Sequence, residues 1–242
     1  MKSKKTLSWI VYILIALSLW QLIAYVVQNS FICPYPKEVF LTMWQQAKQA
    51  TFYQQITATI ARALFAFGIS YAAGLVISMA IYKHTKILPY VEKTILMLRS
   101  VPNVTFIILF LFWMNREWTI TSVSFLLLFP IVFQNSLNSL QAIQEEWQDV
   151  LKIYPQKTMY KWIHIYIPLM KDSMKASAIS TASLAFKVGV MAEILAQVPV
   201  GIGRSMQLAK LDIDLAGVMA WTMWLLLIVF CIDTLIKKLW KE

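Results

Sequence analysis

Apolar runs long enough to cross a bilayer are the feature that most constrains this chain. A helix needs about 20 consecutive apolar residues to cross the hydrocarbon core. Of the 242 residues, 59% are hydrophobic and 14% are charged, against about 25% charged in a typical soluble domain. We therefore expect an all-α membrane protein with six transmembrane helices. The predicted spans cover residues 7–27, 60–82, 91–113, 119–143, 169–195 and 215–236.

The first run follows the basic stretch MKSKK, as the apolar part of a signal peptide would. It is longer than the usual 7 to 15 residues, and no small-residue cleavage site follows it, so we predict a retained helix. We expect one permease-like domain over residues 1–242. In it, residues 1–56 form the first helix and an outer loop, and residues 57–238 form the core.

Basic residues in the short loops predict the orientation, because cytoplasmic loops carry an excess of Lys and Arg. With the N-terminus inside, most lysines fall on the inner side, and the outer loops hold only Lys37, Lys48, Arg116, Arg204 and Lys210. We predict a multi-pass protein of the cell (inner) membrane with both termini cytoplasmic. The net charge of +10 lies at membrane edges beside anionic lipid. We therefore do not expect nucleic acid as a partner.

Several motifs of enzymes and cofactor sites are missing from the sequence. It has no G-x-x-x-x-G-K-[ST] phosphate loop, no H-E-x-x-H zinc motif and no G-x-S-x-G around any serine. Cys33 and Cys231 fall on opposite sides of the predicted membrane, too far apart for a disulfide. We expect no catalytic residue, no metal site and no cofactor on this chain.

One ordered polar segment separates the fourth and fifth predicted spans, with the sequence EEWQDVLKIYPQKTMYKWIHIYIP at residues 145–168. Each half carries one apolar stripe at helical spacing. The stripes are Trp147, Val150, Leu151 and Tyr154, then Met159, Trp162, Ile163, Tyr166 and Ile167. Pro155 lies between them and cannot continue a helix, so we predict helix, break, helix. Such a pair either lies in the headgroup layer or binds a soluble partner, and periodicity does not decide.

This segment resembles the cytoplasmic signature of transmembrane subunits of binding-protein-dependent ATP-binding cassette importers, E-A-A, three residues, Gly, nine residues, I-x-L-P. Asp149, Val150 and Leu151 take the E-A-A places, Pro155 stands at the glycine, and residues 165–168 match I-x-L-P. The resemblance to the family extends to the stretches LRSVPNVTFIILFLFW, KVGVMAEIL and GIG. The stretch CPYPKEVF also looks like the PSP-x-x-V that precedes the core in the nitrate, sulfonate and taurine branch. The resemblance covers residues 33–238.

The resemblance implies that the broken helix pair couples a separate cytoplasmic ATPase, which holds ATP and Mg²⁺, to solute uptake. The implied coupling residues are Asp149, Val150, Leu151, Tyr154, Pro155, Ile165, Ile167 and Pro168. It also implies an extracellular or periplasmic solute-binding protein and a second permease subunit, for which we favour a homodimer. A sulfonate, nitrate, taurine or a thiamine-precursor-like solute fits that branch. The alternative is a self-sufficient secondary transporter, although the two halves show no internal repeat.

The fifth predicted span combines a small-residue face with two charges. Ser177, Thr181, Ala185 and Gly189 recur every fourth position, which lets helix backbones approach closely in lipid. That face packs either within the chain or on a second subunit. Lys187 and Glu193 are candidates for the translocation pathway, because charge at membrane depth is costly and often functional. The alternatives are a position near an interface for Glu193, and snorkelling or a carboxylate partner for Lys187.

Other polar or flexible positions add to the candidate sites. Asn135, in the inner half of the fourth predicted span, either lines the pathway or hydrogen-bonds to another helix. Gly201 and Gly203 fall in the outer loop before the last span and form either a tight turn or an outer gate. Arg99 precedes Val101 and Pro102 and is interpreted as an interface anchor beside a kink, with a substrate ligand as the less favoured alternative.

Overall fold

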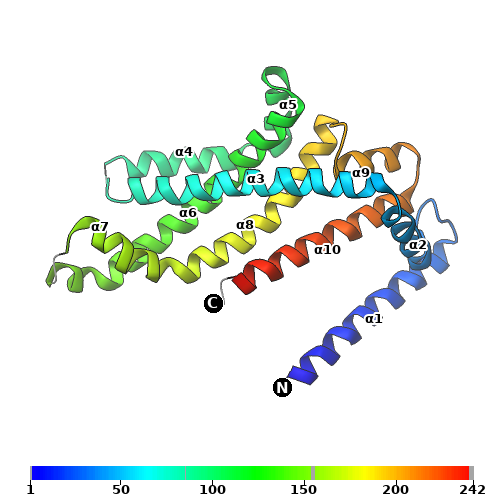
Figure 1. The fold of residues 1–242 in the computed structure, drawn as a ribbon, viewed down its shortest axis with the longest axis horizontal. Helices are drawn as coiled ribbons and strands as arrows, with labels where there is room; N and C mark the ends of the chain where they lie inside the picture. Colours follow the sequence, from blue (N-terminus) through cyan, green and yellow to red (C-terminus); the bar gives the residue numbers. More distant parts are fainter. Residues whose placement is uncertain (1, 85, 154–155, 240–242) are drawn as a thin grey trace.

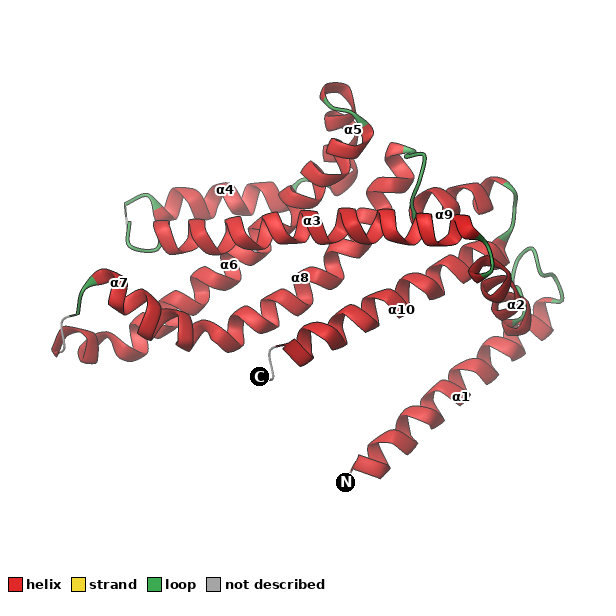
Figure 2. Ribbon diagram, in the orientation of Figure 1, coloured by secondary structure: helices red, strands yellow, loops and turns green. Residues whose placement is uncertain are grey.

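The computed structural model describes residues 2–84, 86–153 and 156–239. Helices are the only regular elements in these ranges (Figure 2), which confirms the predicted all-α class. In chain order they are α1 (Lys2–Val27), α2 (Pro36–Ala47), α3 (Ala50–Ile81), α4 (Leu88–Ser100), α5 (Asn103–Trp113), α6 (Arg116–Ile153), α7 (Thr158–Lys161), the π-helical turn η1 (Trp162–Tyr166), α8 (Ile167–Ala196), α9 (Ile202–Leu211) and α10 (Leu215–Leu239).

Four helical stretches are long and apolar enough to cross a membrane. They are Ala50–Ile81, Arg116–Trp147, Met159–Ala196 and Leu215–Lys238. These stretches contain, or nearly contain, the second, fourth, fifth and sixth predicted spans. The chain is therefore an all-α, multi-pass membrane protein. The helix of the second span begins about ten residues earlier than predicted, so the expected boundary between residues 56 and 57 falls inside α3.

The third predicted span is broken, because residues 91–113 form parts of two helices and not one continuous helix. α4 and α5 meet at an angle of 92°. Val101 is extended, with φ −76° and ψ 131°, as expected for a residue that precedes a proline. Pro102 also has no N–H to extend the helical hydrogen bonding. The first predicted span lies within α1, whose described apolar part is the shorter stretch Val11–Val27. The total of six spans stays a prediction.

Helices α3, α6 and α8 pack together as the centre of the molecule (Figure 1). Small buried residues make this packing close, and those of α3 are Thr59, Ala63, Ala66, Ser70, Gly74 and Ser78. A Cβ atom at Gly74 would lie 2.7 Å from the Cβ of Val132 on α6. Only glycine allows the two backbones to approach so closely at this point, as in other membrane helix pairs.

The two ends of the bundle differ. α2, α9 and the beginnings of α3 and α10 contact one another, and we call this the α9 end. At the opposite end, the α7 end, Tyr82 packs against Tyr166 and Trp162. α1 is followed by α2, and α10 follows α9. The start of α1 and the end of α10 therefore both lie away from the α9 end (Figure 1).

Candidate functional site

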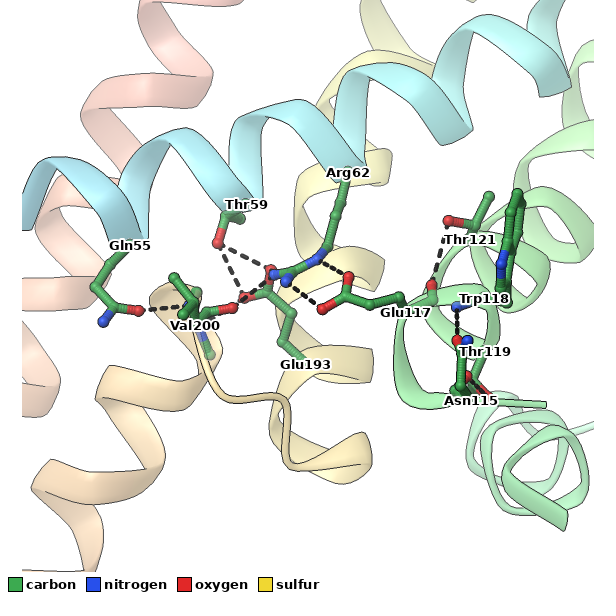
Figure 3. Close-up of polar contacts among 12 residues, drawn as sticks. Gln55, Thr59, Arg62, Asn115, Glu117, Trp118, Thr119, Thr121, Glu193 and Val200 are labelled. Carbon is green, nitrogen blue, oxygen red and sulfur yellow. Dashed lines mark hydrogen bonds and ion pairs between the residues drawn. The ribbon is translucent and has the colours of Figure 1, made fainter.

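A buried carboxylate at the α9 end organises the most connected polar cluster in the described part of the chain. Glu193 is 0% exposed and lies in the last turn of α8. Its oxygens accept hydrogen bonds from Thr59 Oγ1 at 2.9 Å, Arg62 Nη1 at 2.8 Å and the Gly203 N–H at 2.9 Å (Figure 3). The carboxylate therefore joins α3, α8 and α9.

Arg62 extends the cluster to a second carboxylate and to the loop before α9. Its Nε and Nη2 donate to the two oxygens of Glu117, both at 2.6 Å, in the bidentate geometry that suits guanidinium and carboxylate. Nη1 also donates to the carbonyl of Val200 at 2.7 Å. The Arg62 side chain is 14% exposed, against 51% for Glu117 and 1% for Glu193. We call Thr59, Arg62, Glu117, Glu193, Gly201 and Gly203 the Glu193 cluster.

The two glycines of the cluster are required by its geometry. Gly201 has φ +147°, which side chains rarely allow, and a Cβ there would lie 2.5 Å from Glu193 Oε2. A Cβ at Gly203 would lie 2.6 Å from the Cβ of Glu193 and 2.7 Å from the Val190 carbonyl. The loop is also tied to α3, where Gln55 accepts from the Gly201 N–H and Thr59 Oγ1 accepts from the N–H of Ile202 at 2.8 Å. The turn before α9 can therefore pack directly on the carboxylate.

The structure thus brings together three residues that the sequence singled out separately, Glu193, Gly201 and Gly203. It adds Thr59, Arg62 and Glu117, which sequence reasoning missed. A signal was present for two of them, because Thr59 and Arg62 are three residues apart and share a face of α3. Nothing in the sequence places Glu117 beside them.

Lys187 does not join this cluster. Its side chain is exposed on α8, and none of the ion pairs among the described residues involves it. The distance in sequence from Glu193 already indicates different faces of the helix, about 120° apart at 3.6 residues per turn. Whether Lys187 lines a pathway stays a prediction.

The small-residue face of α8 is buried within the chain. Ser177, Thr181, Ala185 and Gly189 are all buried, and Ala185 packs with Ala63 of α3 and Leu128 of α6. A Cβ at Gly189 would meet no heavy atom within 4 Å. Close backbone packing therefore involves α3 and α6 and does not extend to Gly189.

A polar groove of about 610 Å³ lies between α6 and α8. Asn135 lines the groove, and its Nδ2 donates a hydrogen bond to Ser177 Oγ at 3.3 Å. Side-chain hydrogen bonding between helices is thus one role of Asn135. The remaining lining residues that carry hydroxyl or amide groups are Asn138, Ser139, Ser173 and Ser180.

The segment predicted to couple an ATPase lies at the α7 end. α6 ends at Ile153 and helix resumes at Thr158, while Tyr154 and Pro155 lie outside the described residues. Asp149 and Val150 are exposed, and Leu151 packs against the apolar cluster around Tyr82 and Tyr166.

After this interruption, the helix continues through η1 into α8 without a second break. Ile165 is half-buried, whereas Ile167 and Pro168 are exposed. Pro168 is at the start of α8, where a proline is well tolerated. The second half of the polar segment is therefore an extension of the fifth span.

Large apolar side chains remain uncovered on this segment. The exposed aliphatic and thioether side chains are Val150 (46%), Ile153 (69%), Met159 (70%), Ile163 (49%) and Ile167 (42%). We call them the α7 apolar row. They flank charged or polar residues such as Lys157 and Gln156, both exposed, so the row belongs to the polar end of the bundle.

The described part of the chain contains no group of three or more His, Cys, Asp or Glu side chains that could hold a metal ion. Comparison with protein-family models finds no match, and comparison with curated proteins finds none either.

Proposed function

We propose that this chain is the transmembrane subunit of an ATP-driven importer. In this proposal it forms the translocation pathway together with a second permease subunit, for which a homodimer is the simplest arrangement. A separate cytoplasmic ATPase hydrolyses ATP, and a solute-binding protein delivers a small solute such as a sulfonate, nitrate, taurine or a thiamine-precursor-like compound to the outer side. The α7 end faces the cytoplasm.

The α7 apolar row is the observation that carries this proposal. Ile153 and Met159 are about 70% exposed, and the exposed Lys157 lies between them in the sequence. Apolar surface of this kind is stabilised when a protein partner removes it from water. It also falls at the residues that match the coupling signature of the importer family, and a helical segment that presents an apolar row is suited to bind in a groove of a soluble protein.

The Glu193 cluster, at the α9 end, also supports the proposal. A transporter has to keep one end closed while the other is open, and this cluster ties α3, α8 and the loop before α9 together at the α9 end.

Co-purification tests the proposal. The tagged chain would be isolated in mild detergent from its native cell, and the proteins that accompany it would be identified by mass spectrometry. We expect an ATPase with Walker motifs to accompany the unchanged chain and to be lost from Met159→Glu. Leu211→Glu is the matched control, because Leu211 is 68% exposed at the opposite end, and it should retain the ATPase.

Two results would overturn the proposal. One is the absence of any ATPase from the unchanged chain combined with solute movement in liposomes that lack ATP, which would favour a secondary transporter. The other is equal recovery of the ATPase with Met159→Glu and Leu211→Glu, which would mean that the α7 apolar row is not the contact surface.

A further inference from the structure

The break between α4 and α5 borders a small cavity that contains an arginine. The cavity has a volume of about 170 Å³, and Arg99 and Asn103 line it from the two sides of the break. Its other walls come from α6 and α8, through Leu127, Ile131, Leu184 and Val188. None of the described residues that line it is acidic. The cavity is therefore apolar except for one cation and one amide.

With the membrane surface taken at the α9 ends of α6 and α8, this cavity lies near the middle of the membrane. Leu127 lies about 16 Å along α6 from Arg116, and Leu184 and Val188 lie about 18 Å and 12 Å along α8 from Ala196, at 1.5 Å per residue. Both measures are close to half of the roughly 30 Å thickness of the hydrocarbon core. The irregular backbone at Val101 and Pro102 therefore lies at a depth where it is tolerated only inside protein or beside water.

The charge of Arg99 has no partner in the described part of the chain. Neither of the ion pairs involves Arg99, and no hydrogen bond of its side chain occurs among the described residues. The residue is nevertheless exposed, as are Ser100 and Asn103. An unpaired guanidinium facing lipid tails at this depth carries a large free-energy cost, so intramembrane charges usually face a bundle interior or a water-filled cavity. The face that carries Arg99 is therefore one that water or a ligand reaches.

We propose that this cavity binds the anionic group of the transported solute, with the Arg99 guanidinium as charge partner and the Asn103 amide as hydrogen-bond donor. This inference rests on the proposed importer function and gives its pathway a defined site. The volume of about 170 Å³ equals that of about six water molecules at about 30 Å³ each, which suits a sulfonate, carboxylate or phosphate group.

Thiol labelling tests the electrostatic character of the cavity without knowledge of the solute. Leu126, a wall residue, is changed to cysteine in a chain whose two native cysteines, Cys33 and Cys231, are changed to alanine. The full chain in lipid nanodiscs is then reacted with two methanethiosulfonate reagents of similar size, the anionic sulfonatoethyl and the cationic trimethylammonioethyl compound. The quantity measured is the ratio of the anionic to the cationic labelling rate.

Arg99→Gln should lower this ratio several-fold, because a unit charge in the same cavity attracts one reagent and repels the other. At a separation of roughly 7 Å in a water-like medium each of these two effects would be about RT, which together make a factor of about seven. Arg99→Lys should keep most of the ratio, and Arg99→Met serves as a second neutral variant if Arg99→Gln aggregates. A cysteine placed at Leu211 at the α9 end should show a ratio that none of these changes affects.

An unchanged ratio at position 126 in the neutral variants would overturn the proposal. So would a cysteine at that position that both polar reagents leave unlabelled in the folded chain but label after denaturation in detergent, because the cavity would then be closed to water. The labelling needs no ATPase. If the neutral variants leave the labelling ratio unchanged but an ATPase co-purifies with the chain, only the anion site is refuted. If the neutral variants lower the ratio but no ATPase co-purifies, only the importer function is refuted.

Discussion

Removal of the Arg62 side chain should destabilise the folded chain strongly, because it leaves a buried carboxylate without its charge partner. In Arg62→Met, Glu193 stays 0% exposed and keeps hydrogen bonds only from Thr59 and the Gly203 N–H. Loss of one partner of a buried ion pair costs about 3–5 kcal/mol. With a shift of about 2–4 °C per kcal/mol for a chain of this size, the midpoint of thermal unfolding should fall by roughly 6–20 °C.

Two further variants separate the buried pair from the exposed one. Glu117→Gln removes the partner of Arg62 that is 51% exposed, and a surface pair contributes only about 0–1 kcal/mol. Adding Glu193→Gln to Arg62→Met removes the unpaired charge, so the double variant should recover about 1–3 kcal/mol relative to Arg62→Met alone. The expected result is therefore that the double variant is more stable than Arg62→Met alone.

The assay heats samples in mild detergent to a series of temperatures. The fraction of protein that stays monodisperse is then measured by size-exclusion chromatography. The unchanged chain, Arg62→Met, Glu117→Gln, Glu193→Gln and the double variant are compared in the same detergent and at the same protein concentration. A fall for Arg62→Met no larger than that for Glu117→Gln would refute the reasoning. A double variant whose loss equals or exceeds the sum of the two single losses would refute it as well.

Three more predictions follow from the other sites. Gly203→Ala should lower stability in the same heating assay by about 1–3 kcal/mol, since its Cβ would lie 2.6 Å from that of Glu193. Gly68→Ala, whose Cβ meets nothing within 4 Å, should be neutral or gain up to about 1 kcal/mol; equal losses would contradict the account. Pro155→Ala, which permits a continuous helix, should lower transport-coupled ATP hydrolysis more than Pro155→Gly, and equal rates in the two variants would count against a role for the break. Lys187→Met should reduce uptake of the labelled solute once it is identified, while Lys210→Met at the α9 end should not, and unchanged uptake by Lys187→Met would remove this residue from the pathway.

The local sequence pattern predicts four of the membrane helices well, because an apolar run of sufficient length is visible without knowledge of the rest of the fold. The spans around Gly74, Leu128, Ala185 and Ala220 are all present as continuous apolar helices. The pattern also marks Pro102 as an irregular point. It does not give the 92° angle between α4 and α5, because a proline permits many directions and packing against α6 and α8 selects one.

The Glu193 cluster shows where sequence reasoning ends. Glu193 is a visible anomaly in an apolar span, but its partner Arg62 is 131 positions away. Pairing them requires the relative depth and rotation of α3 and α8, which are set by contacts of small residues across the bundle. Gly201 and Gly203 are likewise recognisable as turn residues, whereas their close approach to a carboxylate follows only from the folded arrangement.

The central claim is that the α7 apolar row contacts a cytoplasmic ATPase, and site-specific photocrosslinking in native membranes tests it most directly. A photoreactive amino acid is placed at Met159 in one protein and at Leu211, equally exposed at the other end, in a second. The account predicts that Met159 forms an adduct with an ATPase carrying Walker motifs and that Leu211 does not. Adducts of Met159 with lipid alone would contradict this expectation, because the α7 apolar row would then lie in the membrane surface.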